Sequence, residues 1–340
     1  MRILRAAIGF AISAAAVYLF ARGADWGVVW RGLRDADLVL IAATMPVLLV
    51  VFAMRSFRWH LLFRSDDGVG LWQAFKALHI GYMAANILPL QMGELARVYA
   101  LAKESRIPKA RVLSTVAVER VLDVAVLLIA GAALGPAVGL PTSAVVALGL
   151  VAAAVLLATG IIVVAVVDRP RAERWSSPFL QFVPAPLRPR ARQARDAMLD
   201  GISTLAEVRR LALVIGWTVA SWAMTALVVY MLLQATQIDV PITAAPFVLV
   251  VTTLAFLLPS SPGAVGVYDA AAVTALATGF GVDRELATSY ALLAHAFFVA
   301  PSLVLGGLFV LLMQLRIRNA RPVAEPAVRA DERVPEPGAR

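Results

Sequence analysis

Cysteine is absent from this 340-residue sequence, and charged residues make up only 16% of it. Without cysteine the chain can form no disulfide, no thiolate metal site and no cysteine nucleophile. A soluble domain has about 25% charged residues, so the low charge points away from a soluble protein. Hydrophobic residues make up 61% of the chain. They fall in long runs, several of them near the ~20 residues that cross a hydrocarbon core. We therefore predict a polytopic helical membrane protein.

Several catalytic patterns are also missing. The sequence has no GxxxxGK[ST] phosphate-binding loop, no HExxH zinc motif and no GxSxG nucleophile motif. Only three histidines are present, and their spacing does not suit a metal site. We therefore expect a protein that is not an enzyme and needs no ATP, metal or cofactor. The net charge of +9 comes from basic residues between the apolar runs, which favours positive-inside topology over nucleic-acid binding.

The apolar runs predict how the chain crosses the membrane. Six segments are long enough to cross fully: 3–21, 38–57, 112–135, 144–167, 211–235 and 286–312. The first resembles a signal peptide, but Arg22 lies where cleavage would need small residues, so we interpret it as an uncleaved span. The loop 168–210 carries nine arginines and is expected in the cytoplasm, whereas 22–37 is expected outside despite three arginines. We expect the cytoplasmic (inner) membrane, with both termini cytoplasmic.

Two further apolar stretches, 72–102 and 245–280, must return to the side they left if this topology holds. Each contains a proline four residues before a glycine, in NILPLQMGE and LAFLLPSSPG: Pro89 with Gly93, and Pro259 with Gly263. Pro262 and Gly266 add to the second break. Broken backbone survives in a membrane only against protein or a wet cavity, so we predict two re-entrant helical hairpins.

The order of span, hairpin and span then occurs twice. We predict an all-α polytopic membrane protein with six full transmembrane helices and two re-entrant hairpins in an inverted-topology repeat. One domain covers 1–315, with its first half at 38–135, its second half at 211–313 and the cytoplasmic loop 168–210. The basic, proline-rich tail 316–340 is expected to be disordered.

Ionisable residues at membrane depth are the candidate site. Glu94 and Arg97 follow the first break, and Glu119, Arg120 and Asp123 lie in the next span, Asp123 about 16 Å deep at 1.5 Å per residue. A charge at that depth needs a partner or water. Two compatible interpretations stay open. The residues form a neutralised network that holds the hairpin, or they bind a polar group.

The second half offers Asp269 after its break and His295 in the last span. A hydrogen-bonded core histidine is the default for His295, and a titrating role is the alternative. Arg55 and Arg58 end the second span. We expect them to be interfacial anchors that snorkel toward water, with a phosphate clamp as the alternative.

Three motifs, GYMAANILPLQMGELARVYAL, TVAVERVLD and LLPSSPGAVGVYDAA followed by FGV, resemble the lysylphosphatidylglycerol synthase transmembrane-domain family. This flippase-like domain also forms the N-terminal half of the bacterial multiple peptide resistance factor, and the resemblance covers residues 3–312. The matching motif residues are Asn86, Pro89, Gly93, Glu94, Arg97, Glu119, Arg120 and Asp123. Two positions depart: Asp269 replaces a usual glutamate and His295 a usual arginine.

The resemblance implies translocation of a polar or charged lipid headgroup between leaflets. No part of this chain resembles the soluble aminoacyltransferase of some members, so lipid synthesis is not carried over. The expected headgroup-binding residues are Asn86, Glu94, Arg97, Glu119, Arg120, Asp123, Asp269 and His295, with Arg97 and Arg120 on phosphate. The expected partners are a membrane phospholipid or another anionic or polar lipid, a second copy of the chain, and an envelope-lipid enzyme. The alternatives are a transporter of a small polar solute or ion, and a membrane scaffold for such an enzyme.

Overall fold

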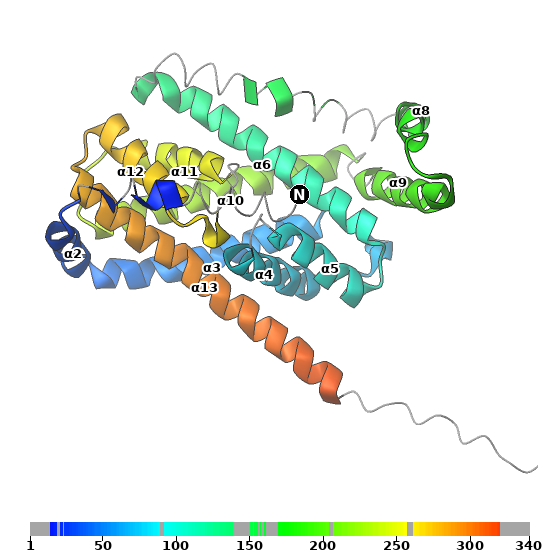
Figure 1. Cartoon of the computed structure of the whole chain (residues 1–340), viewed down its shortest axis with the longest axis horizontal. Coiled ribbons are helices and arrows are strands. Elements are labelled where there is room, and N and C mark those ends of the chain that lie inside the picture. Colours follow the sequence, from blue (N-terminus) through cyan, green and yellow to red (C-terminus); the bar gives the residue numbers. More distant parts are fainter. Residues whose placement is uncertain are drawn as a thin grey trace, which may run out of the picture.

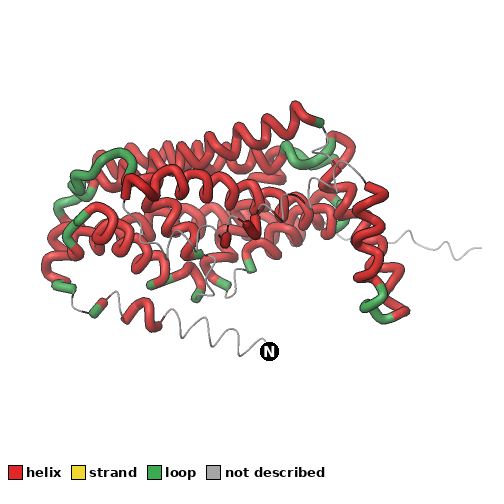
Figure 2. The backbone as a smooth tube through the Cα atoms, turned by 90° about the horizontal axis from the view of Figure 1, so that it is seen from above, coloured by secondary structure: helices red, strands yellow, loops and turns green. Residues whose placement is uncertain are grey.

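The described part of the chain is helical throughout. A computed structural model describes residues 14–18, 21–22, 24–88, 92–138, 150–151, 153–155, 157, 160, 169–203, 207–256 and 261–319. These ranges contain helices and loops but no strand (Figure 2). Four helical segments are long and apolar enough to cross a membrane: Leu38–His60, Val208–Ala235, Pro262–Phe280 and Arg284–Leu315. The prediction of an all-α membrane protein is confirmed.

Helices occupy the predicted spans and hairpin arms that are described, and three more, α2, α8 and α9, lie in the predicted loops 22–37 and 168–210. The helices are α2 (Trp26–Arg34), α3 (Leu38–His60), α4 (Leu71–Ile87), α5 (Gly93–Ser105), α6 (Lys109–Val138), α8 (Arg169–Leu180), α9 (Arg188–Ser203), α10 (Val208–Ala235), α11 (Ala244–Ala255), α12 (Val267–Phe280) and α13 (Arg284–Asn319). Most of the predicted spans 3–21 and 144–167 lies outside the described residues. The structure differs from prediction at the tail. Helix α13 continues to Asn319, four residues into the predicted tail, and the rest of the tail lies outside the described residues.

Helices α3 and α10 lie side by side and run antiparallel. Asp37 caps the start of α3 by accepting hydrogen bonds from the Val39 and Leu40 amides, and its own amide donates to Ala235 at the end of α10. At the opposite end, Arg210 donates to the carbonyl oxygen of Phe63 over 3.2 Å. The first long helices of the two sequence halves therefore point in opposite directions.

Helices α4 and α5 form a tight antiparallel hairpin. Lys76 pairs with Glu104 near its open end. Near its tip, glycine allows the two backbones to approach: a Cβ atom on Gly93 would lie 2.6 Å from the Cβ atom of Ala85, and one on Gly81 would lie 2.8 Å from that of Arg97. Small residues serve the same purpose at other membrane helix contacts.

Helices α11 and α12 form a second antiparallel hairpin. Phe247 and Phe280 meet at the open end, and Phe256 and Tyr268 meet near the tip. The tip contains a short 3-10 turn, η4 (Pro262–Ala264). Pro262–Phe280 is one of the four segments long enough to span, although we expected it in a hairpin arm. Length alone does not distinguish a full membrane span from a hairpin arm. The antiparallel pairing of α12 with α11 is the arrangement expected of a hairpin.

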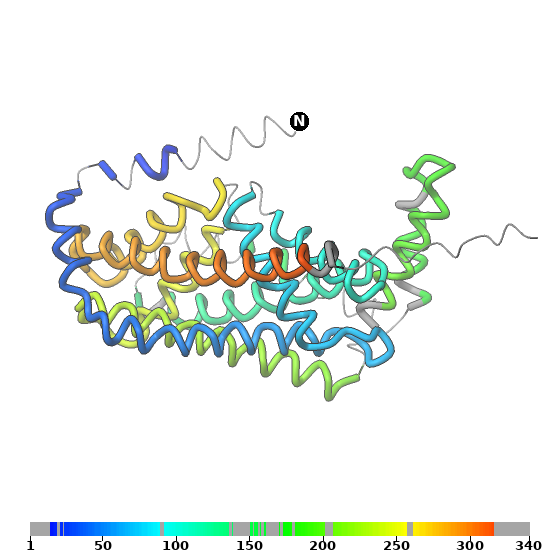
Figure 3. The backbone as a smooth tube through the Cα atoms, turned by 90° about the horizontal axis from the view of Figure 1, so that it is seen from below, coloured from blue at the N-terminus to red at the C-terminus, as the bar shows by residue number. Residues whose placement is uncertain are grey.

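The two halves exchange contacts. Helix α4 packs against α13, where a Cβ atom on Gly306 would lie 2.5 Å from the carbonyl oxygen of His79, and α11 packs against α6. Figure 1 shows α6 and α13 as two long helices, with α4 and α10–α12 between them and α3 crossing α13 in this view. Helices α8 and α9, from the arginine-rich loop, lie at one end of this bundle (Figures 1 and 3). The halves therefore share one packed unit.

Replacing Gly93 with Ala is expected to destabilise the protein by about 1–3 kcal/mol, because the methyl group would overlap Ala85 and the two hairpin backbones would have to separate. The matched control is Gly216→Ala in α10, where nothing lies within 4 Å of the added carbon. That change should leave stability unchanged or raise it, since alanine favours helix. Thermal unfolding in detergent measures both, and equal effects would contradict the close approach.

Candidate functional site

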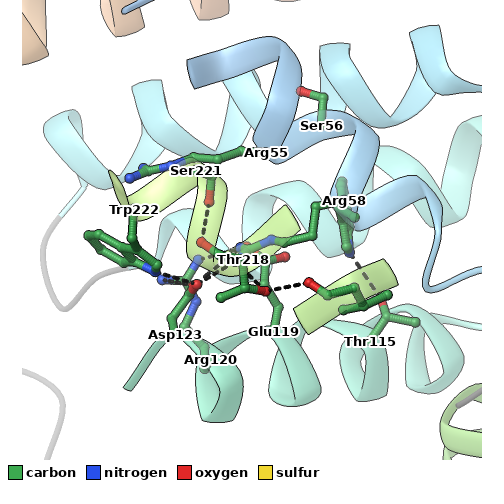
Figure 4. A network of polar contacts seen from close by, with 12 residues as sticks. Arg55, Ser56, Arg58, Thr115, Glu119, Arg120, Asp123, Thr218, Ser221 and Trp222 are labelled. Carbon is green, nitrogen blue, oxygen red and sulfur yellow. Dashed lines mark hydrogen bonds and ion pairs between the residues drawn. The ribbon is translucent and has the colours of Figure 1, made fainter. Parts of the chain in front are cut away.

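A network of buried ion pairs joins α3, α6 and α10. Arg58, only 2% exposed, donates from Nη2 to Glu119 over 2.8 Å and pairs through Nη1 with Asp123. Nη1 also lies 3.3 Å from the Thr218 hydroxyl of α10, and the Trp222 indole donates to Asp123 over 2.9 Å. Figure 4 shows these side chains converging from the three helices.

The first hairpin joins this network through α5. Arg97 is buried, pairs with Glu94 one turn away and reaches Glu119 over 3.1 Å. Its guanidinium also lies 4.8 Å from the ring centroid of Trp59, a cation–π contact. Arg120 reaches Glu94 over 3.2 Å and Glu119 over 3.2 Å, while 46% of its side chain stays accessible. The tip of the hairpin is therefore fixed to α6 by charge.

The network is electrically balanced. Its three arginines, Arg58, Arg97 and Arg120, face three carboxylates, Glu94, Glu119 and Asp123. A lone charge in a low-dielectric interior costs roughly several kcal/mol, so mutual pairing explains how Arg58, Arg97, Glu119 and Asp123 can be buried, while Arg120 and Glu94 remain partly accessible.

A second polar cluster holds the other hairpin. The Asp269 carboxylate accepts a hydrogen bond from the Gly266 amide over 2.9 Å, which caps α12, and lies 3.0 Å from Nδ1 of His295. Nε2 of His295 lies 2.9 Å from the carbonyl oxygen of Gly263. Both ring nitrogens thus face acceptors, and both contacts are hydrogen bonds only when each nitrogen carries a proton. The geometry therefore suits a cationic His295 beside the Asp269 carboxylate.

Two glycines shape this tip. Gly263 and Gly266 adopt φ angles of +69° and +81°, a region that other residues resist. A Cβ atom on Gly263 would lie 3.5 Å from Oδ1 of Asn86, at the end of α4. The tips of the two hairpins therefore meet, and His295 holds the second tip in place.

A cavity of about 320 Å³ lies where the hairpins meet. Its wall contains the ionisable residues Arg55, Glu94, Arg97, Arg120 and His295, hydroxyl and amide groups, and apolar side chains from α3, α4, α10, α11, α12 and α13. Its volume is at the lower end of the range for small-molecule pockets, about 300–1,000 Å³. The space suits a polar group of modest size rather than a whole lipid.

Among the predicted binding residues, Asn86, Glu94, Arg97, Arg120 and His295 line this cavity. Glu119, Asp123 and Asp269 are buried behind them as their partners. Of the predicted break residues, Pro89 and Pro259 lie outside the described residues, whereas Gly93 and Gly263 border the cavity. The structure brings the first-half residues together, since most of them lie on two adjacent helices, α5 and α6.

The expectation of interfacial, snorkelling arginines needs correction. Arg58 does not reach toward water, because Glu119 and Asp123 hold its guanidinium inside the bundle. Arg55 is half-buried, donates to the Thr225 hydroxyl over 3.1 Å and lies 5.0 Å from the Trp222 ring centroid, on the cavity wall. Both residues belong to the site.

Sequence reasoning missed the polar face of α10. Thr218, Ser221, Trp222 and Thr225 recur at helical spacing within an apolar run. Thr218 and Thr225 contact arginines of α3, Trp222 contacts Asp123 of α6, and Ser221 donates to the Thr218 carbonyl within α10. The sequence does contain the pattern that predicts this face. Hydroxyl groups and an indole N–H recur at intervals of three and four residues, and such positions share one face of a helix.

The described residues form an α-helical membrane bundle with two packed hairpins and a buried charge cluster. The protein is therefore an integral membrane protein of the all-α class. Residues 6–306 match the family described as the lysylphosphatidylglycerol synthase TM region. The chain belongs to this family, as its motifs indicated.

Two curated relatives share this similarity. A UPF0104 membrane protein of Methanothermobacter thermautotrophicus is 26% identical over 262 residues, which cover 72% of this chain and 76% of the relative. The glycosyltransferase AglD of Haloferax volcanii is 27% identical over 340 residues, which cover 88% of this chain but only 53% of AglD. No solved structure matches the chain.

Replacing Arg58 with Met is expected to destabilise the protein by about 3–5 kcal/mol, because Glu119 and Asp123 would lose a buried partner. The double variant Arg58→Met, Asp123→Asn restores charge balance and should recover much of the loss. Arg64→Met, which removes an exposed arginine paired with Asp66, should have no measurable effect. Thermal unfolding in detergent compares the three, and equal losses for Arg58 and Arg64 would contradict the assignment.

His295 allows a separate test of the second tip. His295→Leu leaves the buried Asp269 carboxylate unpaired and frees the Gly263 carbonyl, so we expect a loss of about 3 kcal/mol or more in detergent unfolding experiments. His295→Arg keeps a cationic donor and should retain more stability than His295→Leu. The reverse order would contradict a cationic role.

Proposed function

We propose that this protein translocates a polar or charged lipid headgroup across the cytoplasmic membrane without ATP. The observation that carries the proposal is the cavity between the two hairpin tips, with ionisable residues in its wall. Ionisable groups inside a membrane mark substrate pathways, and transporter sites lie where broken helices of two repeats meet.

The proposed topology has six full spans and two re-entrant hairpins in an inverted repeat, with both termini in the cytoplasm. Three packing relations support it. Helices α3 and α10, which hold equivalent places in the two halves, run antiparallel. Helix α4 packs on α13, and α11 packs on α6, so each first hairpin arm contacts the last long helix of the other half. Equivalent elements of two repeats related by a two-fold axis make such paired contacts, and in transporters built this way the site lies at the interface between the repeats.

In this proposal the headgroup occupies the cavity while the acyl chains stay in lipid. The cavity wall combines apolar side chains such as Phe52 and Phe298 with polar groups such as Asn86, Thr252 and Ser261. A wall of this kind replaces headgroup hydration with fixed hydrogen-bond partners, which lowers the barrier to crossing. Transport of this kind breaks no bond and needs no catalytic group.

A second candidate is a membrane partner of an envelope-lipid enzyme. One relative is named a glycosyltransferase, and this chain covers about half of it. In that case the balanced charge network would serve stability alone. A transporter of a small polar solute is a third possibility, which a closed, water-filled route to the same cavity would favour.

Purified protein in liposomes containing acyl-labelled fluorescent phospholipids tests the main proposal. We expect faster exchange of label between leaflets than in protein-free vesicles for at least one headgroup. Thr253→Trp, which places an indole in the cavity, should abolish the gain because it fills the space a headgroup needs. Thr278→Trp, an exposed position on α12, is the matched control and should retain activity.

Two results would count against transport. One is the absence of exchange above protein-free vesicles across several headgroups, and the other is full activity in a folded Thr253→Trp variant. Monodisperse elution and an unchanged unfolding temperature establish that each variant is folded.

A further inference from the structure

We propose that the cavity selects a headgroup with one net negative charge, the charge of a phosphodiester, and that Arg55 is the residue that recognises it. This inference rests on the proposed function and names the substrate class for the same site. It differs from the expectation that Arg97 and Arg120 bind phosphate, because their charges are already compensated.

The ion-pair network around the cavity has no net charge. Arg58, Arg97 and Arg120 are matched by three carboxylates within ion-pair distance. An anion that drew Arg97 away would leave Glu119 with one partner fewer in a buried position. Such a loss is costly in a low-dielectric site, so Arg97 is better suited to holding the wall than to following a ligand.

His295 and Asp269 lie at the opposite wall of the cavity and balance each other's charge. His295 donates to both Asp269 and Gly263 when it is cationic, and Asp269 then balances its charge. Tyr268 is the other titratable residue beside this ring, with ring centroids 4.8 Å apart. In the state with both hydrogen bonds made, this cluster adds no net charge to the cavity.

Arg55 is the remaining cation. Among the described residues that line the cavity, it is the arginine with no carboxylate within 4.0 Å. One of its amino groups donates to Thr225, and its guanidinium faces the Trp222 ring. Guanidinium has five N–H donors, so most of them stay free for an anionic oxygen. The described residues around the cavity therefore carry one excess positive charge when His295 is cationic.

Phosphodiester chemistry fits this count. A phosphodiester has one negative charge and two unesterified oxygens, which a guanidinium can engage in two parallel hydrogen bonds. A zwitterionic headgroup would bring a cation beside a carboxylate, Glu94, that Arg97 and Arg120 already neutralise. Hydroxyl and amide groups at Thr252, Ser261 and Asn86 offer further hydrogen bonds to whatever the phosphate carries.

The test compares lipids that differ in headgroup charge. The full chain in detergent is titrated with fluorescent phosphatidylglycerol and with phosphatidylcholine, which share acyl chains and a phosphodiester but differ by one positive charge. We expect phosphatidylglycerol to bind about tenfold more tightly, because the choline cation of phosphatidylcholine would add a second positive charge to a cavity that Arg55 already makes positive. Glycerophosphoglycerol, the same headgroup without acyl chains, should bind more weakly than the lipid.

Three variants isolate the arginine. Arg55→Gln should bind both lipids more weakly and lose the preference between them, and Arg55→Lys should restore part of both because it keeps the charge but not the fork geometry. Arg64→Gln, an exposed arginine near the same end of α3, should keep the full preference. Arg55→Gln should fold, since no carboxylate loses its partner.

Each outcome has one meaning. Equal binding of the two lipids by the native chain, or an undiminished preference in Arg55→Gln, would overturn the inference. Tighter binding of glycerophosphoglycerol than of the lipid would overturn the assignment to lipids. Selective binding without any exchange in liposomes would uphold this inference and count against transport. Exchange of both lipids at equal rates, together with equal binding, would support transport and overturn this inference.

Discussion

The guanidinium of Arg58, held between Glu119 and Asp123, ties together three helices that are distant in the sequence. A charge inside a membrane protein cannot be left unpaired, because neither lipid nor packed side chains can replace its hydration. The pairing therefore fixes the register of α3 against α6, and contacts to Thr218 and Trp222 extend the restraint to α10. Sliding α3 against α6 by one turn would separate the charges, and sliding α10 would break its hydrogen bonds to them.

The same requirement shapes the cavity. Because Glu119 also accepts from Arg97, the first hairpin is anchored through the network that fixes the long helices. The second hairpin has its own anchor in His295 and Asp269. Both tips are thus positioned by charge, and the space between them is bordered by backbone and small residues such as Gly93 and Gly263. The charge clusters that stabilise the two hairpins therefore also border the candidate site.

The sequence predicts the helical class, the two broken segments and the grouping of Glu119, Arg120 and Asp123, since these depend on apolar length and helical spacing. It does not reveal the role of Arg58, whose partners lie 61 and 65 positions away and are reached only once α3 packs on α6. An arginine near the end of an apolar run has the same local pattern whether it reaches water or an internal carboxylate. His295 and Asp269 are likewise joined by packing of α12 on α13.

Trp222 gives the cavity a native optical reporter. Its indole N–H donates to Asp123, and its ring faces the Arg55 guanidinium on the cavity wall. Indole emission responds to nearby charge and hydration, so a ligand that engages Arg55 changes the field at this ring without any attached label. The chain has seven tryptophans, and Trp59 also lies against a network arginine. A single-tryptophan variant that retains Trp222 would therefore make occupancy of the cavity visible in real time.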